Sequence, residues 1–212
     1  MKSNMFHKAG SLRAIRGFTM VELLVTITLI VVLAGISAIG FSKWVRQAKL
    51  VASVAKVHDL GASVISYVTD KGELPVWHDY TRGMYWWQLL AESDGNSDPL
   101  RFKSPGDSAF DPLRVAQTIS YGWNYPVVGR HKGDSGYRTD HTLRLTNFDR
   151  LDNILILADG PASNCWGYID GYYNKPDPER FGGKVAAVFL DGSARVLETP
   201  SEFQPESKWY IP

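Results

Sequence analysis

Cysteine is almost absent from this sequence: among its 212 residues there is one, Cys165. A single cysteine forms no intramolecular disulfide and supplies neither a CxxC metal site nor a redox pair, so we interpret Cys165 as a small buried thiol. The five histidines include no HExxH pair and no other pair at metal-ligand spacing. The composition therefore gives no disulfide framework and no metal motif.

The short motifs of common enzymes are missing as well. There is no Gly-x-Ser-x-Gly, no phosphate-binding loop and no dinucleotide-binding fingerprint. We therefore predict no catalytic residue and no cofactor, and we expect that the protein is not an enzyme.

An excess of charge of one sign is also lacking, because 23 Lys and Arg face 22 Asp and Glu, for a net charge of +1. The basic residues are unevenly placed. Residues 1–17 contain no acid, and removing their four basic residues leaves 19 basic against 22 acidic residues, a net charge of −3. A chain without a dominant basic patch is a poor candidate for nucleic-acid binding. The basic residues of this leader are Lys2, Lys8, Arg13 and Arg16.

Proline is missing before Pro75, so nothing in the first part of the chain interrupts a long helix. Residues 18–41 are long and apolar enough to span a bilayer, with Glu22 as their one charged residue. Apolar residues then recur at helical spacing as far as residue 69. We predict one helix over residues 18–69, with the basic leader on the cytoplasmic side of the membrane.

Three interpretations of this apolar segment compete. A secretory signal peptide could be cut after Ile36-Ser37-Ala38, but its apolar core would be shorter and uncharged. A plain membrane anchor explains everything except the cost of Glu22 in lipid. Cleavage after Gly17 is the third: it would free an amine on Phe18, one helical turn from Glu22, that could pair with the acid within one chain or between neighbours.

The residues Gly17-Phe18-Thr19-Met20-Val21-Glu22-Leu23-Leu24 resemble the processing site of type IV pilins and type II secretion pseudopilins. The resemblance covers about the first 60 residues. It implies cleavage after Gly17 by a prepilin peptidase, N-methylation of Phe18, and assembly through Glu22. Many family members have a proline within the apolar stretch, whereas this chain has only Gly35 and Gly40 there.

The same resemblance implies the partners and the location of the protein. The partners would be the prepilin peptidase, other pilin or pseudopilin subunits and an inner-membrane assembly platform. The subunit would cross the inner membrane once, with its leader cytoplasmic and its head periplasmic, before it enters a filament or reaches the cell surface. Lys43 and Arg46 would then lie at the outer interface, with Trp44 as an aromatic anchor.

Residues 70–212 are predicted to form an α+β head in which an antiparallel sheet packs on the second half of the helix, a pilin-like fold. We expect a short helix at 83–93 and a long loop at 94–116. The predicted strands are 117–123, 142–148, 153–158, 167–170 and 184–190.

The last strand should begin a hairpin, because Asp191-Gly192 between two extended runs is typical of a type I′ turn. This region also resembles a group of pilin-like proteins that end with His, nine residues and Asp-Gly. Phe181 occupies the place of that His here, so this chain departs from the group's pattern at that position.

The head also contains candidates for two further sites. Loop carboxylates can bind calcium, and Asp152, Asp159 and Asp191 are the candidates, although turn and cap roles are the commoner use of such residues. The alternative function is that of a membrane-tethered protein that binds a glycan or another ligand and uses the helix only as an anchor. Its candidate surface consists of Trp166, Tyr168, Tyr172 and Tyr173.

Overall fold

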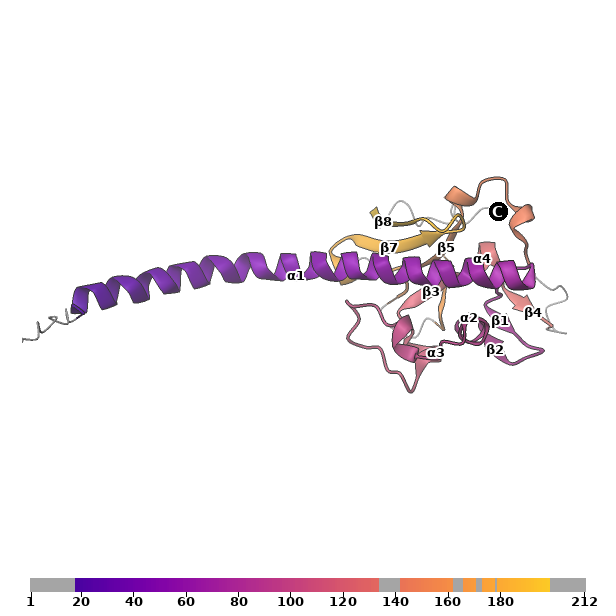
Figure 1. Ribbon diagram of the computed structural model, residues 1–212, viewed down its shortest axis with the longest axis horizontal. Coiled ribbons are helices and arrows are strands. Elements are labelled where there is room, and N and C mark those ends of the chain that lie inside the picture. Colours follow the sequence, from indigo (N-terminus) through magenta and orange to yellow (C-terminus); the bar gives the residue numbers. More distant parts are fainter. Residues whose placement is uncertain (1–17, 134–141, 162–165, 171–172, 178, 199–212) are drawn as a thin grey trace, which may run out of the picture. The chain divides into compact units, whose positions relative to one another are not determined.

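The computed structural model describes residues 18–133, 142–161, 166–170, 173–177 and 179–198 (Figure 1). The chain divides into two compact units, Met1–Lys43 and Trp44–Pro212. Helix α1, Met20–Lys71, contributes to both. The second unit contains the remainder of α1 and all the other elements, and is called the head below.

Helix α1 confirms the predicted long helix to within two residues at each end. Its end is set by Gly72, which has a φ of +74° and donates its N–H to the Val68 carbonyl at 2.8 Å. A glycine in the left-handed region is a common helix terminator because it has no Cβ to clash. The α+β, pilin-like fold class is likewise confirmed: one long helix is followed by a small, mainly antiparallel sheet.

The head contains two sheets. The larger has five strands in the order β6-β3-β5-β7-β8, and the smaller has three in the order β2-β1-β4. All pairs are antiparallel except β3 with β6 and β1 with β4. The strands are β1 His78–Asp79, β2 Met84–Tyr85, β3 Tyr121–Asn124, β4 His131–Lys132, β5 Leu155–Asp159, β6 Tyr168–Ile169, β7 Lys184–Phe189 and β8 Ala194–Glu198.

Short helices connect these strands. Helix α2 confirms the predicted helix but begins later, because Met84 and Tyr85 pair with β1 instead. The predicted loop at 94–116 contains one helical turn and the start of another. The helices are α2 Trp86–Asp94, η1 Pro99–Phe102, α3 Val115–Thr118, α4 Tyr125–Val128, η2 Leu145–Asn147, η3 Leu151–Asn153 and η4 Glu179–Phe181.

Two predicted strands need correction. The strand expected at 142–148 is wrong: its centre is the helical turn η2, which the Asn147 side chain closes by accepting the Arg144 N–H. The strand expected at 117–123 is correct only from Tyr121. Its first residues belong to α3, where the Thr118 hydroxyl donates to the Arg114 and Asp111 carbonyls, each at 3.0 Å. Local side-chain bonds of this kind compete with strand pairing.

The terminal hairpin is confirmed, but its turn is not type I′. Gly192 has a φ of +84°, whereas Asp191 lies outside the positive-φ region that a type I′ turn demands. The Gly192 N–H donates to the Phe189 carbonyl at 2.9 Å, and the Phe189 N–H donates to the Ser193 carbonyl at 2.9 Å. This is a three-residue loop in which a glycine follows a type I turn. The Asp191 carboxylate accepts the Ser193 N–H and hydroxyl and so holds the longer loop.

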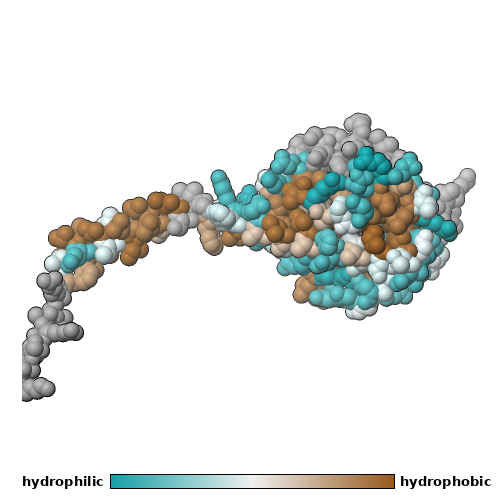
Figure 2. All heavy atoms as spheres, turned by 45° about the horizontal axis from the view of Figure 1, so that its top comes forward, coloured by the Kyte–Doolittle hydropathy of each residue, from teal (hydrophilic) through white to brown (hydrophobic). Residues whose placement is uncertain are grey.

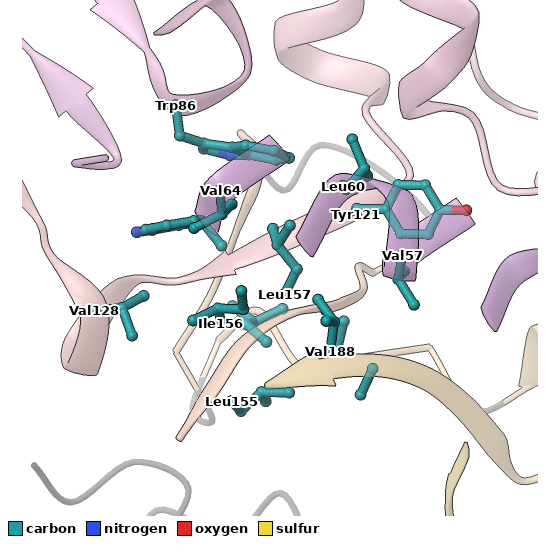
Figure 3. Close-up of a cluster of buried hydrophobic side chains, with 14 of the residues drawn as sticks. Val57, Leu60, Val64, Trp86, Tyr121, Val128, Leu155, Ile156, Leu157 and Val188 are labelled. Atoms are coloured by element: carbon teal, nitrogen blue, oxygen red, sulfur yellow. The ribbon is translucent and has the colours of Figure 1, made fainter. Parts of the chain in front are cut away.

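The main core lies between α1 and the five-stranded sheet. Val57, Leu60 and Val64 of α1 are at most 2% exposed and pack toward side chains of β5 and β7 (Figure 3). Gly61 permits the closest approach, since a methyl group at its Cα would lie 2.5 Å from the Val188 Cγ2. No Cβ fits at that distance, so the glycine sets how closely the helix packs on β7.

Replacing Gly61 by Ala should destabilise the head. Alanine is the better helix former by about 1 kcal/mol, but overpacking a tight core typically costs about 1–3 kcal/mol. We expect the clash to prevail and the free energy of unfolding of the full chain in detergent to fall by up to about 2 kcal/mol.

The matched variant is Gly61→Ala with Val188→Ala, which restores the space. The cost of the double variant should be smaller than the sum of the two single costs. Ser66→Ala, at an exposed position of the same helix, should change stability little. Additive costs would show that Gly61 and Val188 are not in tight contact.

Candidate functional site

The start of α1 forms a capping box from Thr19 and Glu22. The Glu22 N–H donates to the Thr19 hydroxyl at 3.2 Å, and the Thr19 N–H donates to the Glu22 carboxylate at 2.9 Å. The Thr19 hydroxyl also donates to that carboxylate at 2.8 Å. These bonds satisfy backbone groups that a helix start leaves without partners. The motif Thr-x-x-Glu could have been recognised in the sequence as a capping box.

One oxygen of the Glu22 carboxylate, Oε2, accepts the hydrogen bonds from both the Thr19 N–H and the Thr19 hydroxyl. The described residues direct no hydrogen bond to Oε1. Phe18 is described and its side chain is 74% exposed, whereas Gly17 lies outside the described residues. The acid therefore caps its own helix with one oxygen and has the other available.

The first part of α1 has an apolar surface without a partner inside the chain. Its large side chains, from Met20 to Ile36, are at least 50% exposed. In Figure 2 the visible side of this segment is mostly hydrophobic. Such a surface requires lipid or other protein around it. Among the described residues no single helix meets the length and hydropathy of a membrane span, and the segments Met20–Ile36 and Phe41–Lys71 meet it only when taken together.

The three calcium candidates have separate protein partners. Asp152 accepts from the Arg150 guanidinium at 2.8 Å, Asp191 holds the hairpin loop, and Asp159 is fully buried beside Arg180. Among the residues described, no group of three or more His, Cys, Asp or Glu is arranged to hold a metal. Calcium binding thus stays a prediction, without support from the arrangement of these carboxylates.

Sequence reasoning missed a buried ionic network around Arg180, whose side chain is 3% exposed. Its guanidinium lies 3.3 Å from the Asp159 carboxylate and 3.5 Å from that of Asp107. Asp159 also accepts the Ala186 N–H at 2.8 Å and the Ser53 hydroxyl at 3.1 Å. The network therefore joins α1, the loop before α3, the end of β5 and the start of β7. No spacing rule predicts this, because the residues are far apart in sequence.

Burial raises the pKa values of two side chains of this region, Asp159 and Tyr121. Burial raises the pKa of the Asp159 carboxyl, while Arg180 and the Ala186 N–H act in the opposite direction. Burial also raises the pKa of the Tyr121 hydroxyl, which lies 3.2 Å from the Ser53 hydroxyl and stays protonated at neutral pH. A buried charge network of this kind is costly to break. It connects elements of the head, and we assign it a structural role.

The proposed glycan surface is only partly assembled. Trp166 and Tyr173 are 39% and 92% exposed, but Tyr168 is half-buried, with its ring 5.3 Å from that of Trp77. Tyr172 lies outside the described residues. Tyr168 is therefore used in packing, and the four residues do not make one exposed platform.

Phe181, at the position of the His in the resembling group, is a core residue. It is 4% exposed, and a methyl group at Gly106 would lie 2.7 Å from its ring. The hairpin that follows it exists, but its likeness to that group rests on the sequence pattern alone.

Comparison with known families bears on the N-terminal segment. Residues 12–38 match the family model described as the prokaryotic N-terminal methylation motif. The chain carries the methylation motif. The match includes Gly17, Phe18 and Glu22 and supports the resemblance to type IV pilins and pseudopilins, and with it processing and assembly of the pilin type. No curated protein and no solved structure matches the chain.

The buried network generates a stability prediction. Arg180→Met would leave two carboxylates buried without their cation, and breaking a buried pair typically costs about 3–5 kcal/mol. We expect a loss of this size in the free energy of unfolding, measured by chemical denaturation of the full chain in detergent.

Adding Asp159→Asn to Arg180→Met should recover part of the loss, because one of the stranded charges is removed. Arg150→Met, which breaks the exposed pair with Asp152, is the control and should have little effect. Equal stability of the Arg180 and Arg150 variants would show that the buried network contributes nothing.

Proposed function

We propose that this protein is a structural subunit of a filament, either a type II secretion pseudopilus or a type IV pilus. In this proposal a prepilin peptidase cleaves after Gly17 and methylates Phe18. The first part of α1 then passes from the inner membrane into a bundle of like helices. The match at residues 12–38 to the methylation motif is the observation that carries the proposal.

The exposed surface of α1 supports assembly through the helix. An apolar stretch with no partner in the chain can be covered by lipid before assembly and by neighbouring subunits afterwards. An inner-membrane platform would bring the subunits together, with the head on the periplasmic side. The aromatic residues of the head give no comparable support for a tethered binding protein, since Tyr168 is packed against Trp77.

Glu22 can act twice in this scheme. In the single subunit its Oε2 caps the helix. In the filament its Oε1 would accept a hydrogen bond from the methylated amine of Phe18 on a neighbour. A charge-assisted bond in a low-dielectric bundle is strong, and an unpaired charge there is costly. The pairing would fix the stagger between helices without loss of the cap.

Substitutions at Glu22 test whether its charge is needed. Glu22→Ala removes the cap and the charge, whereas Glu22→Gln keeps an oxygen for the cap and removes only the charge. If the charge pairs with a neighbour, both variants should lose filaments, measured by shearing cells and sedimenting the assembled protein. Mass spectrometry of the same samples should find methyl-Phe18 as the first residue of the wild-type protein.

The matched control is Thr19→Ala, which removes a capping hydroxyl, at a cost of about 1 kcal/mol of helix stability, and keeps the charge. It should still assemble. Normal filaments from Glu22→Gln would show that Glu22 serves as a cap and not as a counterion. Wild-type protein with residues 1–17 still attached would contradict the proposed processing.

A further inference from the structure

Several basic residues follow the apolar stretch of α1, and no acidic residue lies near them in the sequence. No Asp or Glu occurs between Glu22 and Asp59. Arg46 and Lys49 are exposed, and the described residues provide neither with a hydrogen bond or ion pair. Trp44, two residues before Arg46 and on another side of α1, is 76% exposed. An exposed tryptophan and two cations without acidic partners, placed around one stretch of the helix, suit an anionic, partly apolar partner.

The fold gathers these cations on one side of α1. Arg46 and Lys49 are three residues apart and so share a face of the helix. It is the face that the head covers further along, since Leu50 and Ser53 are buried. The Arg46 side chain lies over the backbone between η4 and β7: a methyl group at Gly182 would be 3.1 Å from its Nη1. Lys184, two residues later, is 42% exposed in an ion pair with Glu198.

The positions of Trp44 and Arg46 along the helix match the headgroup layer of a membrane, and Lys49 lies just beyond it. At 1.5 Å per residue, Trp44 lies about 5 Å beyond Phe41 and Lys49 about 12 Å beyond it. The polar layer of one leaflet is roughly 5–8 Å thick, and Arg and Lys side chains can reach back toward it. The positive-inside rule predicts few basic residues on the outer side of the membrane. Basic residues at this position therefore suggest a specific local interaction.

We infer that Trp44, Arg46 and Lys49 form a membrane-facing collar that binds anionic phospholipid headgroups in the outer leaflet and holds the head against the membrane before assembly. The inference rests on the anchoring by α1 that the proposed function includes. Anionic headgroups supply the negative charge that this part of the chain lacks, and the Trp44 indole suits the apolar boundary. The contact would be lost when the subunit leaves the bilayer.

The test uses the full chain in nanodiscs of phosphatidylcholine, with or without about one third of phosphatidylglycerol. A spin label on the lipid headgroup quenches nearby indoles, and the difference between wild type and Trp44→Phe isolates Trp44. We expect stronger quenching of Trp44 in the anionic discs. It should fall to the neutral-lipid level at about 1 M salt, where the screening length is about 3 Å.

Arg46→Gln with Lys49→Gln should also remove the increase, because each basic residue near an anionic surface contributes roughly a five-fold factor to binding. Lys71→Gln is the control, since it removes a positive charge in the last turn of α1, away from these residues, and should leave quenching unchanged. Equal quenching in both lipids would overturn the inference.

The remaining outcomes separate this inference from the proposed function. If the double variant loses filaments but keeps its lipid-dependent quenching, the cations contact a second copy of the chain and the inference fails while the filament proposal stands. If the wild-type chain does not associate with the discs, the anchor itself is absent and both proposals fail. If methyl-Phe18 and filaments are found but the quenching of Trp44 does not depend on anionic lipid, the collar inference fails and the filament proposal stands.

Discussion

The packing of α1 on β5 and β7 is the constraint on which the rest of the head depends. Gly61 lets the helix approach Val188 closely, and the valines and leucines around it are almost completely buried. The sheet therefore has one face committed to the helix, and the short helices and long connections are arranged around that contact. Because α1 also provides the apolar segment, the element that organises the head is the one through which the subunit would enter a filament.

A second level of order comes from charge inside the head. The Arg180 side chain is almost fully buried among carboxylates from distant parts of the chain, and Ser53 brings α1 into the same network. Hydrophobic packing alone tolerates small shifts between helix and sheet, whereas hydrogen-bonded charges require particular positions. The packing at Gly61 thus sets the distance between α1 and the sheet, and the charge network favours one position of α1 along the sheet.

The long helix, the α+β class and the terminal hairpin could be predicted because each depends on local patterns: helical periodicity without proline, and Asp-Gly between extended runs. The prediction of a type I′ turn was wrong because the Asp191 carboxylate accepts a hydrogen bond from the Ser193 N–H and stabilises a longer loop. The prediction of a strand at 142–148 was wrong because the Asn147 side chain closes the η2 turn. The alternation of apolar and polar residues, on which the prediction was based, does not reveal such a bond. At the candidate site the sequence motif predicts roles for Gly17, Phe18 and Glu22, and these stay predictions. Arg180 and Asp159 meet only through tertiary structure.

The outer strands of the larger sheet have a consequence for how copies of the chain can join. Strand β6 has two residues, and β8 carries Arg195, whose guanidinium lies 3.7 Å from the Phe189 ring centre and donates to the Asp152 carbonyl at 2.6 Å. Very short or charged border strands are poor templates for adding another strand. Polymers of this protein would therefore grow without extending its β-structure, which keeps ordered growth distinct from amyloid-like stacking.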